Sequence, residues 1–156
     1  MRVAGIAVDV PKTNRPVARL VVLSGSSAAP IVEANEVFSG DNADLATQLH
    51  DMAEAVRSRL QGLGVDRSLI RRADRPPRAN NNEGPRLRLL AEGAVISAAR
   101  SVVVDTRVGT GKDTGTWFGS NKTGVDGAAG ALLTTAGLPT SLVEATSAAL
   151  AGLALP

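Results

Sequence analysis

A chain of 156 residues has the length expected of one ordinary domain, and a hydrophobic content of 44% is enough for a packed core. The absence of cysteine excludes disulfides, thiolate zinc sites and cysteine nucleophiles, and the single histidine, His50, leaves no second imidazole for a metal site. The formal net charge is only +2 and no apolar run approaches the length of a membrane span, so we expect a cytoplasmic protein.

The beginning of the chain predicts three strands joined by short turns. They cover residues 2–10, 17–24 and 31–38, where apolar residues dominate or alternate with polar ones, and Pro, Asn and Gly mark the turns between them. Because short connections join antiparallel neighbours, these strands favour a meander.

A helix and a fourth strand are predicted next. Apolar residues recur at helical spacing over 45–60, with Asp41 or Asn42 as the expected N-cap and Gly62 at the expected end. A strand over 68–73 follows this helix, so we expect it to lie parallel to the first strand.

The second half of the chain alternates loops with helices. The predicted elements are a polar loop over 74–83, a helix over 85–98, a strand over 101–106, a glycine-rich loop over 108–124, a helix over 125–136 and a short terminal helix with a capping box of Ser141 and Glu144. The order is β-β-β-α-β-α-β-α with one further helix. It predicts an α/β fold with a five-stranded mixed sheet flanked by helices.

This order resembles that of the ribonuclease-H-like superfamily, and within it the RuvC-type Holliday-junction resolvases. Three segments carry the resemblance: IAVDV with Asp9 near the end of the first strand, GPRLRLLAEGAVISAAR as a long helix rich in small residues, and KTGVDGAAGALLTTAG as the last acidic helix. The resemblance implies a single ribonuclease-H-like domain over residues 1–156.

Two positions differ from the family pattern. Ala129 stands at the second Asp of the family's D-A-A-D-A-L, and Asp74 is the carboxylate nearest to the family's Glu after the fourth strand.

The resemblance implies that Asp9, Asp74 and Asp126 are catalytic residues and ligands of Mg²⁺. Carboxylate oxygens suit this ion, and two such ions can clamp the attacking and leaving oxygens of a phosphodiester. The ends of the first and fourth strands are neighbours in the predicted sheet, so Asp9 and Asp74 are expected to meet there. The same residues also fit other roles: a turn or cap for Asp9, ion pairs with neighbouring arginines for Asp74, and helix-dipole stabilisation for Asp126.

A basic segment and a glycine-rich loop are candidates for contacts with nucleic acid. Guanidinium groups bind phosphate bidentately, and arginines outnumber acids over residues 66–88. The alternative is a solvated loop whose arginines pair with acids. The candidate nucleic-acid-binding residues are Arg71, Arg72, Arg75, Arg78, Lys112 and Lys122.

The sequence leaves two main functions open. The first is a RuvC-like metal-dependent endonuclease that acts on branched or structured DNA. The second is a catalytically inactive ribonuclease-H-like module that binds nucleic acid or assembles with itself. A third, weaker interpretation is a fragment of an actin-like ATP-binding fold.

Leu89 and Ile96 fall outside the main apolar stripe of their helix, which suggests a twin subunit and hence a homodimer.

Overall fold

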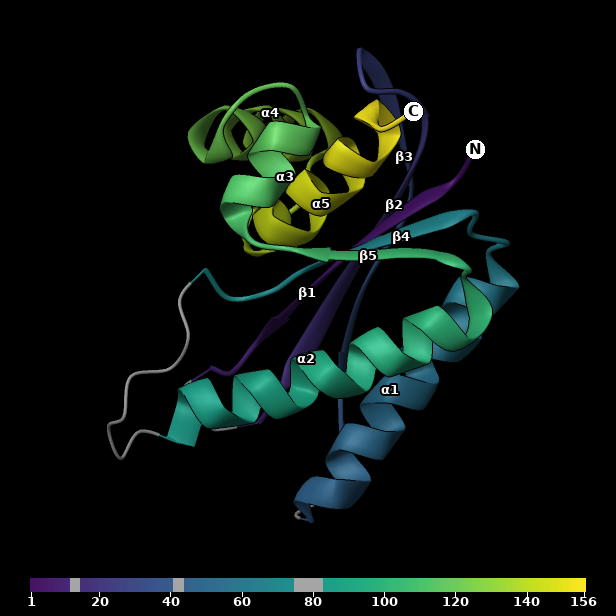
Figure 1. Cartoon of the computed structure of the whole chain (residues 1–156), viewed down its shortest axis with the longest axis vertical. Helices are drawn as coiled ribbons and strands as arrows, with labels where there is room; N and C mark the ends of the chain where they lie inside the picture. The colour runs from purple at the N-terminus through teal and green to yellow at the C-terminus, as the bar shows by residue number, and fades with distance from the viewer. Residues whose placement is uncertain (12–14, 41–43, 75–82) are drawn as a thin grey trace.

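The computed structural model describes residues 1–11, 15–40, 44–74 and 83–156 (Figure 1). Its centre is a five-stranded sheet in the order β3-β2-β1-β4-β5. The strands are β1 (Val3–Asp9), β2 (Val17–Ser26), β3 (Ala29–Ser39), β4 (Arg67–Arg71) and β5 (Asp105–Gly109).

The pairing of the strands confirms the predicted mixed sheet. β1 pairs antiparallel with β2, and β2 pairs antiparallel with β3, as a meander requires. β1 pairs in parallel with β4, and β4 in parallel with β5, as expected for strands that follow helices. In this register Ala7 of β1 lies between Arg19 of β2 and Arg71 of β4.

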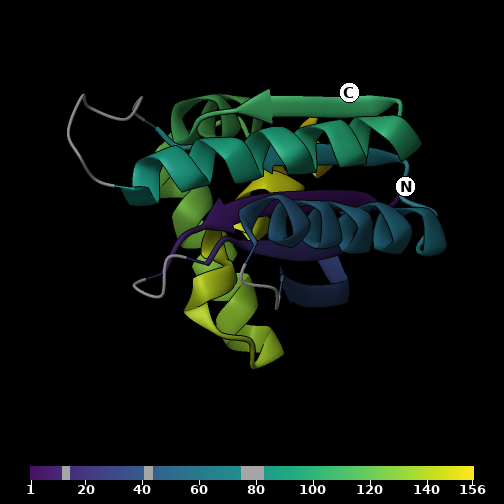
Figure 2. The ribbon, with the colours of Figure 1, turned by 90° about the horizontal axis from the view of Figure 1, so that it is seen from below.

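Helices cover both faces of the sheet (Figures 1 and 2). One face carries α1 (Leu45–Gly62) and α2 (Glu83–Val102), which pack with the even-numbered side chains of β1. The other face carries α4 (Lys122–Ala136) and α5 (Val143–Ala154), which pack with the odd-numbered ones. The short helix α3 (Gly111–Trp117) lies beside α4 and α5, and a 3₁₀ turn, η1 (Thr140–Leu142), leads into α5.

The helix α5 lies very close to the sheet because the facing residues are small. Alanines fill its buried face, and a Cβ placed on Gly5 of β1 would overlap the backbone of Ala145 and Ala149. No helix in the described ranges is both long and apolar enough to cross a membrane.

The region between α2 and α4 differs from the prediction. The segment SVVVDT was expected to form a strand over 101–106, but Ser101 and Val102 complete the last turn of α2, and β5 begins only at Asp105. The Ser101 hydroxyl donates to the carbonyl of Ala98 at 2.7 Å, a bond within that last turn. The expected loop over 108–124 contains α3, whose N-cap Thr110 forms a capping box with Asp113.

Two predicted caps are also wrong. The N-cap of α1 is Asp44, whose side chain accepts from the Thr47 amide at 2.9 Å, rather than Asp41 or Asn42, which lie outside the described residues. The first residues of α5 have no side-chain cap, so the capping box of Ser141 and Glu144 does not form. The 3₁₀ turn before α5 takes its place.

Candidate functional site

A buried arginine stands at the carboxyl end of the central strands. Arg71 is the last residue of β4 and pairs in register with Ala7 of β1. Its side chain is only 2% exposed and reaches toward the start of α4. A charged side chain this buried is stable only with a partner, so its contacts define the chemistry of this position.

Asp126, in the first half of α4, is that partner. Its Oδ1 lies 2.5 Å from Nη1 of Arg71, and its Oδ2 lies 3.2 Å from Nη2, so the pair is bidentate. Ser147 of α5 donates its hydroxyl to the same Oδ1 at 2.7 Å. Burial of Asp126 opposes ionisation, but the bonds from Arg71 and Ser147 outweigh it and hold the pKa of Asp126 below its usual value.

Asp74 lies just beyond β4 and is held by two other groups. The amide of Gly111, the first residue of α3, donates to its Oδ1 at 2.7 Å, and Lys122 forms an ion pair with its Oδ2. Partial burial works against ionisation, but Lys122 and the Gly111 amide lower the pKa of Asp74 below its usual value. The charge of Arg71 acts on both Asp74 and Asp126, so these two carboxylates share a cationic environment.

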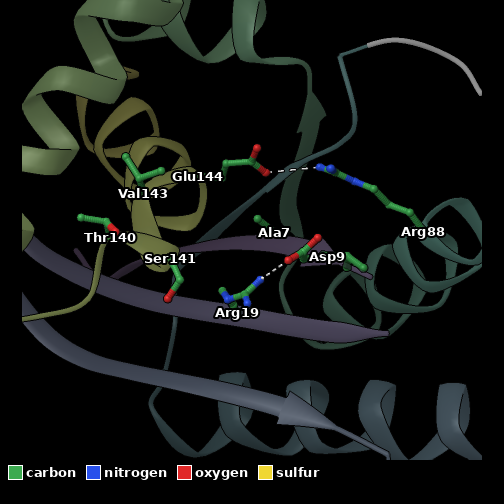
Figure 3. A pocket seen from close by; sticks show the side chains of 9 residues that line it. Ala7, Asp9, Arg19, Arg88, Thr140, Ser141, Val143 and Glu144 are labelled. Carbon is green, nitrogen blue, oxygen red and sulfur yellow. Dashed lines mark hydrogen bonds and ion pairs between the residues drawn. The ribbon is translucent and has the colours of Figure 1, made fainter. Parts of the chain in front are cut away.

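Asp9 has a separate partner. Its Oδ2 accepts from Nη1 of Arg19 on β2 at 3.1 Å, and its side chain is 49% exposed. This pair lies on the wall of a pocket of about 240 Å³ whose other charged residues are Arg88 of α2 and Glu144 of α5 (Figure 3).

The residues present do not fit a Mg²⁺ site in this arrangement. Asp126 gives both oxygens to a guanidinium and Asp74 gives its oxygens to Lys122 and an amide, while Asp9 pairs with Arg19. Within the described residues, no group of three or more acidic or histidine side chains is placed to hold a metal ion. The assignment of Asp9, Asp74 and Asp126 as joint metal ligands and catalytic residues stays a prediction. Ala129, where the family pattern has an Asp, is buried in the core.

The candidate nucleic-acid-binding residues divide into buried and exposed ones. Arg71 is buried and committed to Asp126, whereas Arg72, Lys112 and Lys122 are exposed. Hydrogen bonds from Thr110 lower the pKa of Asp113, and the charges of Arg72 and Lys112 lower it further, which places both cations near the start of α3. Arg75 and Arg78 lie outside the described residues.

Two other arginines of the basic segment have structural partners. Arg67 donates to the backbone carbonyls of Gly152 at 2.9 Å and Leu155 at 3.0 Å, which ties β4 to the end of α5. Arg88 pairs with Glu92 on its own helix and with Glu144 on α5. These two arginines of the segment therefore hold elements of the fold together.

Sequence reasoning missed several polar residues of this region. Arg19 is the one charged side chain in the otherwise apolar segment VARLVVLS, and that interruption was the available signal. Glu92 lies almost fully buried on α2 and accepts from the amide of Ala73 at 2.8 Å, which anchors the chain after β4. Glu144 was expected only as a capping residue and Ser147 carried no signal, because the place of both depends on how α5 crosses the sheet.

No protein-family model matches this chain, and no curated protein matches it in sequence. A solved structure of Thermus thermophilus RuvC matches 97% of this chain and 92% of that one, with a TM-score of 0.69 and 17% identity. T. thermophilus RuvC in complex with a Holliday junction substrate matches the same shares with a TM-score of 0.71 and 18% identity. At such identities the likeness is one of fold, and this chain has a RuvC-like, ribonuclease-H-like fold.

Proposed function

We propose that this protein is a catalytically inactive ribonuclease-H-like module that binds nucleic acid at the carboxyl ends of β4 and β5. The observation that carries the proposal is the buried pair of Arg71 and Asp126. A guanidinium already neutralises the carboxylate that a metal ion would need. If a metal ion displaced Arg71 from Asp126, the guanidinium of Arg71, which is 2% exposed, would lose its partner at a cost of several kcal/mol.

The exposed cations support the binding half of the proposal. Arg72 extends beyond β4, where its amide donates to the carbonyl of Gly109 at 3.0 Å, and Lys112 lies in the first turn of α3. Lys122 stands next to them and shares Asp74 with the Gly111 amide. Cations gathered at one end of a sheet attract phosphates and release counterions, whatever the base sequence. A RuvC protein of the same fold has been seen with a Holliday junction, which makes four-way DNA the first ligand to try.

The metal-dependent endonuclease remains the second candidate, favoured by the fold and by the carboxylates at Asp74 and Asp126 around one cationic centre. It requires Arg71 to leave Asp126 when DNA and Mg²⁺ arrive.

One experiment separates the two functions. A four-way DNA junction is incubated with wild type and Asp9→Asn in Mg²⁺ or Mn²⁺, and both binding and cleavage are measured. We expect binding that weakens steeply with salt and a junction that stays intact with both proteins. Cleavage by wild type that is lost in Asp9→Asn would establish the nuclease instead.

The binding surface is tested with the double variant Arg72→Ala, Lys112→Ala. If both side chains contact phosphates, the slope of log affinity against log salt falls by about 2 and the affinity falls by at least about tenfold. The matched control is Arg57→Ala, Arg100→Ala, which removes the same charge from the C-terminal halves of α1 and α2, at the other end of the sheet. Equal losses in the two double variants would point to net charge alone. Absence of binding at low salt would leave self-assembly, measured by sedimentation, as the function.

A further inference from the structure

The pocket beside Asp9 has a composition that the proposed function does not use. It lies at the carboxyl end of β1, where α2 and α5 approach each other from opposite faces of the sheet (Figure 3). The polar residues that line it are Asp9, Arg19, Arg88, Thr140, Ser141 and Glu144. Arg71 and Asp126 are not among its lining residues, although the pocket adjoins the buried pair, because the charge of Glu144 also acts on Arg71.

Two arginines enter this pocket from different elements. Arg19 projects from the start of β2 and is 19% exposed, and Arg88 comes from the N-terminal half of α2 and is 24% exposed. Each is paired with a carboxylate that is more exposed than itself, Asp9 at 49% and Glu144 at 41%. The guanidinium groups are therefore more buried than the carboxylates, which lie at the solvent side of the pocket.

The arginines also keep hydrogen-bonding capacity for a ligand. Arg88 donates its Nε to the nearly buried Glu92 at 3.0 Å, so its position survives the loss of the contact between its Nη2 and Glu144 at 3.2 Å. Arg19 gives one nitrogen to Asp9 and, within the described part of the chain, has no second recorded partner. The exposed residues Thr140 and Ser141 add hydroxyl groups at the rim.

We propose that this pocket binds a phosphate group. Arg19 and Arg88 would donate hydrogen bonds to its oxygens from two sides of the pocket, and the hydroxyl of Ser141 would donate from a third side. The ion pairs of Arg19 with Asp9 and of Arg88 with Glu144 would break when phosphate binds. A phosphate has enough oxygens and charge to meet two guanidinium groups at once, for which a planar carboxylate is a poorer match. The phosphate can belong to a nucleic-acid backbone or to a small phosphorylated molecule, and the inference holds without the proposed nucleic-acid function.

Calorimetric titration of the full chain with inorganic phosphate, at constant ionic strength, tests the pocket directly. We expect saturable one-to-one binding that is tighter than that of acetate. Arg19→Gln is expected to weaken it by about tenfold, since one charge-assisted interaction is lost. Glu144→Gln removes the carboxylate that competes for Arg88 and is expected to strengthen binding. Arg57→Gln, an arginine of α1 paired with Glu54, is the matched control and is expected to change nothing.

The gain in Glu144→Gln keeps the test decisive even if Arg19→Gln fails to fold. The inference is overturned if neither wild type nor Glu144→Gln binds phosphate saturably, if acetate binds as well as phosphate, or if folded Arg19→Gln binds like wild type.

Two further experiments identify the source of the phosphate. Displacement of phosphate by junction DNA indicates a backbone phosphate. Binding of a nucleoside 5′-monophosphate that DNA does not displace indicates a small molecule. Failure of the Arg72 and Lys112 test leaves the phosphate titration unaffected, so the two failures are distinguishable.

Discussion

Arg71 is the residue on which the chemistry of this molecule depends. It ends a strand whose side chains are otherwise packed in the core, and its guanidinium is satisfied by Asp126 with a bidentate contact. Asp126 itself is held by Ser147 at 2.7 Å. The cost of burying the two charges is thus offset by a closed set of hydrogen bonds.

The coupling of this pair is a testable property. Asp126→Asn leaves Arg71 buried without its bidentate partner, and we expect the free energy of unfolding to fall by about 3 kcal/mol. Arg71→Met combined with Asp126→Asn removes the orphaned charge, so the double variant is expected to be more stable than Asp126→Asn alone. Chemical denaturation of wild type, Asp126→Asn, Arg71→Met and the double variant gives the comparison.

The control is the exposed pair of Asp9 and Arg19. Asp9→Asn is expected to cost less than about 1 kcal/mol, because solvent screens a half-exposed ion pair. If the stability lost by the double variant of Arg71 and Asp126 equals the sum of the losses in Arg71→Met and Asp126→Asn, the two residues are not coupled.

At the scale of elements, the sequence predicted each strand and helix best where its period was regular. The stripe of apolar residues over 45–60 and the alternation over 31–38 became α1 and β3. The boundary between α2 and β5 was displaced because Val102 fits a strand as well as it fits the last turn of a helix. The helix α3 was missed because glycines stand inside it, and tertiary contacts stabilise it: Gly111 donates to Asp74, and Gly115 allows α4 to approach.

The close contact between α5 and β1 gives a prediction for the whole helix. In Gly5→Ala the new methyl group would overlap the backbone of Ala145 and Ala149, so α5 must move away from the sheet. We expect a loss of stability at the upper end of overpacking effects, about 3 kcal/mol or more. Thermal or chemical denaturation measures it.

Gly127→Ala is the matched control for that change. Gly127 lies inside α4, and a Cβ added there would meet nothing within 4 Å. The substitution is expected to raise the free energy of unfolding by about 0.5–1 kcal/mol, because alanine favours the helix. A Gly5→Ala variant as stable as wild type would show that α5 is not seated as closely as described.

At the scale of the whole molecule, the order of strands and helices followed from the sequence, whereas the arrangement of charges did not. Right-handed crossovers and short turns leave few arrangements for β-β-β-α-β-α-β-α, so β1 next to β4 was predictable. Which cation meets which carboxylate depends on side chains far apart in the chain: 55 residues separate Arg71 from Asp126. The sequence predicted that Asp9, Asp74 and Asp126 converge, and it counted Arg71 among the contacts to phosphate, whereas Arg71 pairs with Asp126 inside the fold. The predicted twin subunit stays a prediction, with Leu89 exposed and Ile96 packed partly against the core.

These ion pairs also predict how the stability of the whole protein depends on pH. Every carboxyl pKa that is clearly shifted within the described residues is shifted downward, chiefly by hydrogen bonds and cations that outweigh burial. These groups are Asp44, Glu54, Asp74, Asp105, Asp113 and Asp126. A group with a lowered pKa in the folded state stabilises it above the pKa of the unfolded chain, and this stabilisation is lost as the pH falls through the folded value.

We therefore expect the contribution of these groups to be complete at neutral pH. The free energy of unfolding should decline below about pH 4, because these carboxylates bind protons in the unfolded chain while they stay ionised in the folded protein. The measurement is the free energy of unfolding from denaturant titrations at a series of pH values.

Asp126→Asn removes one group with a lowered pKa, so the stability of this variant should fall less steeply with acid than that of wild type, although it starts lower. Gly127→Ala changes no charge and should shift the curve without changing its slope. A slope in Asp126→Asn equal to that of wild type would mean that Arg71 does not hold Asp126 ionised in the folded state.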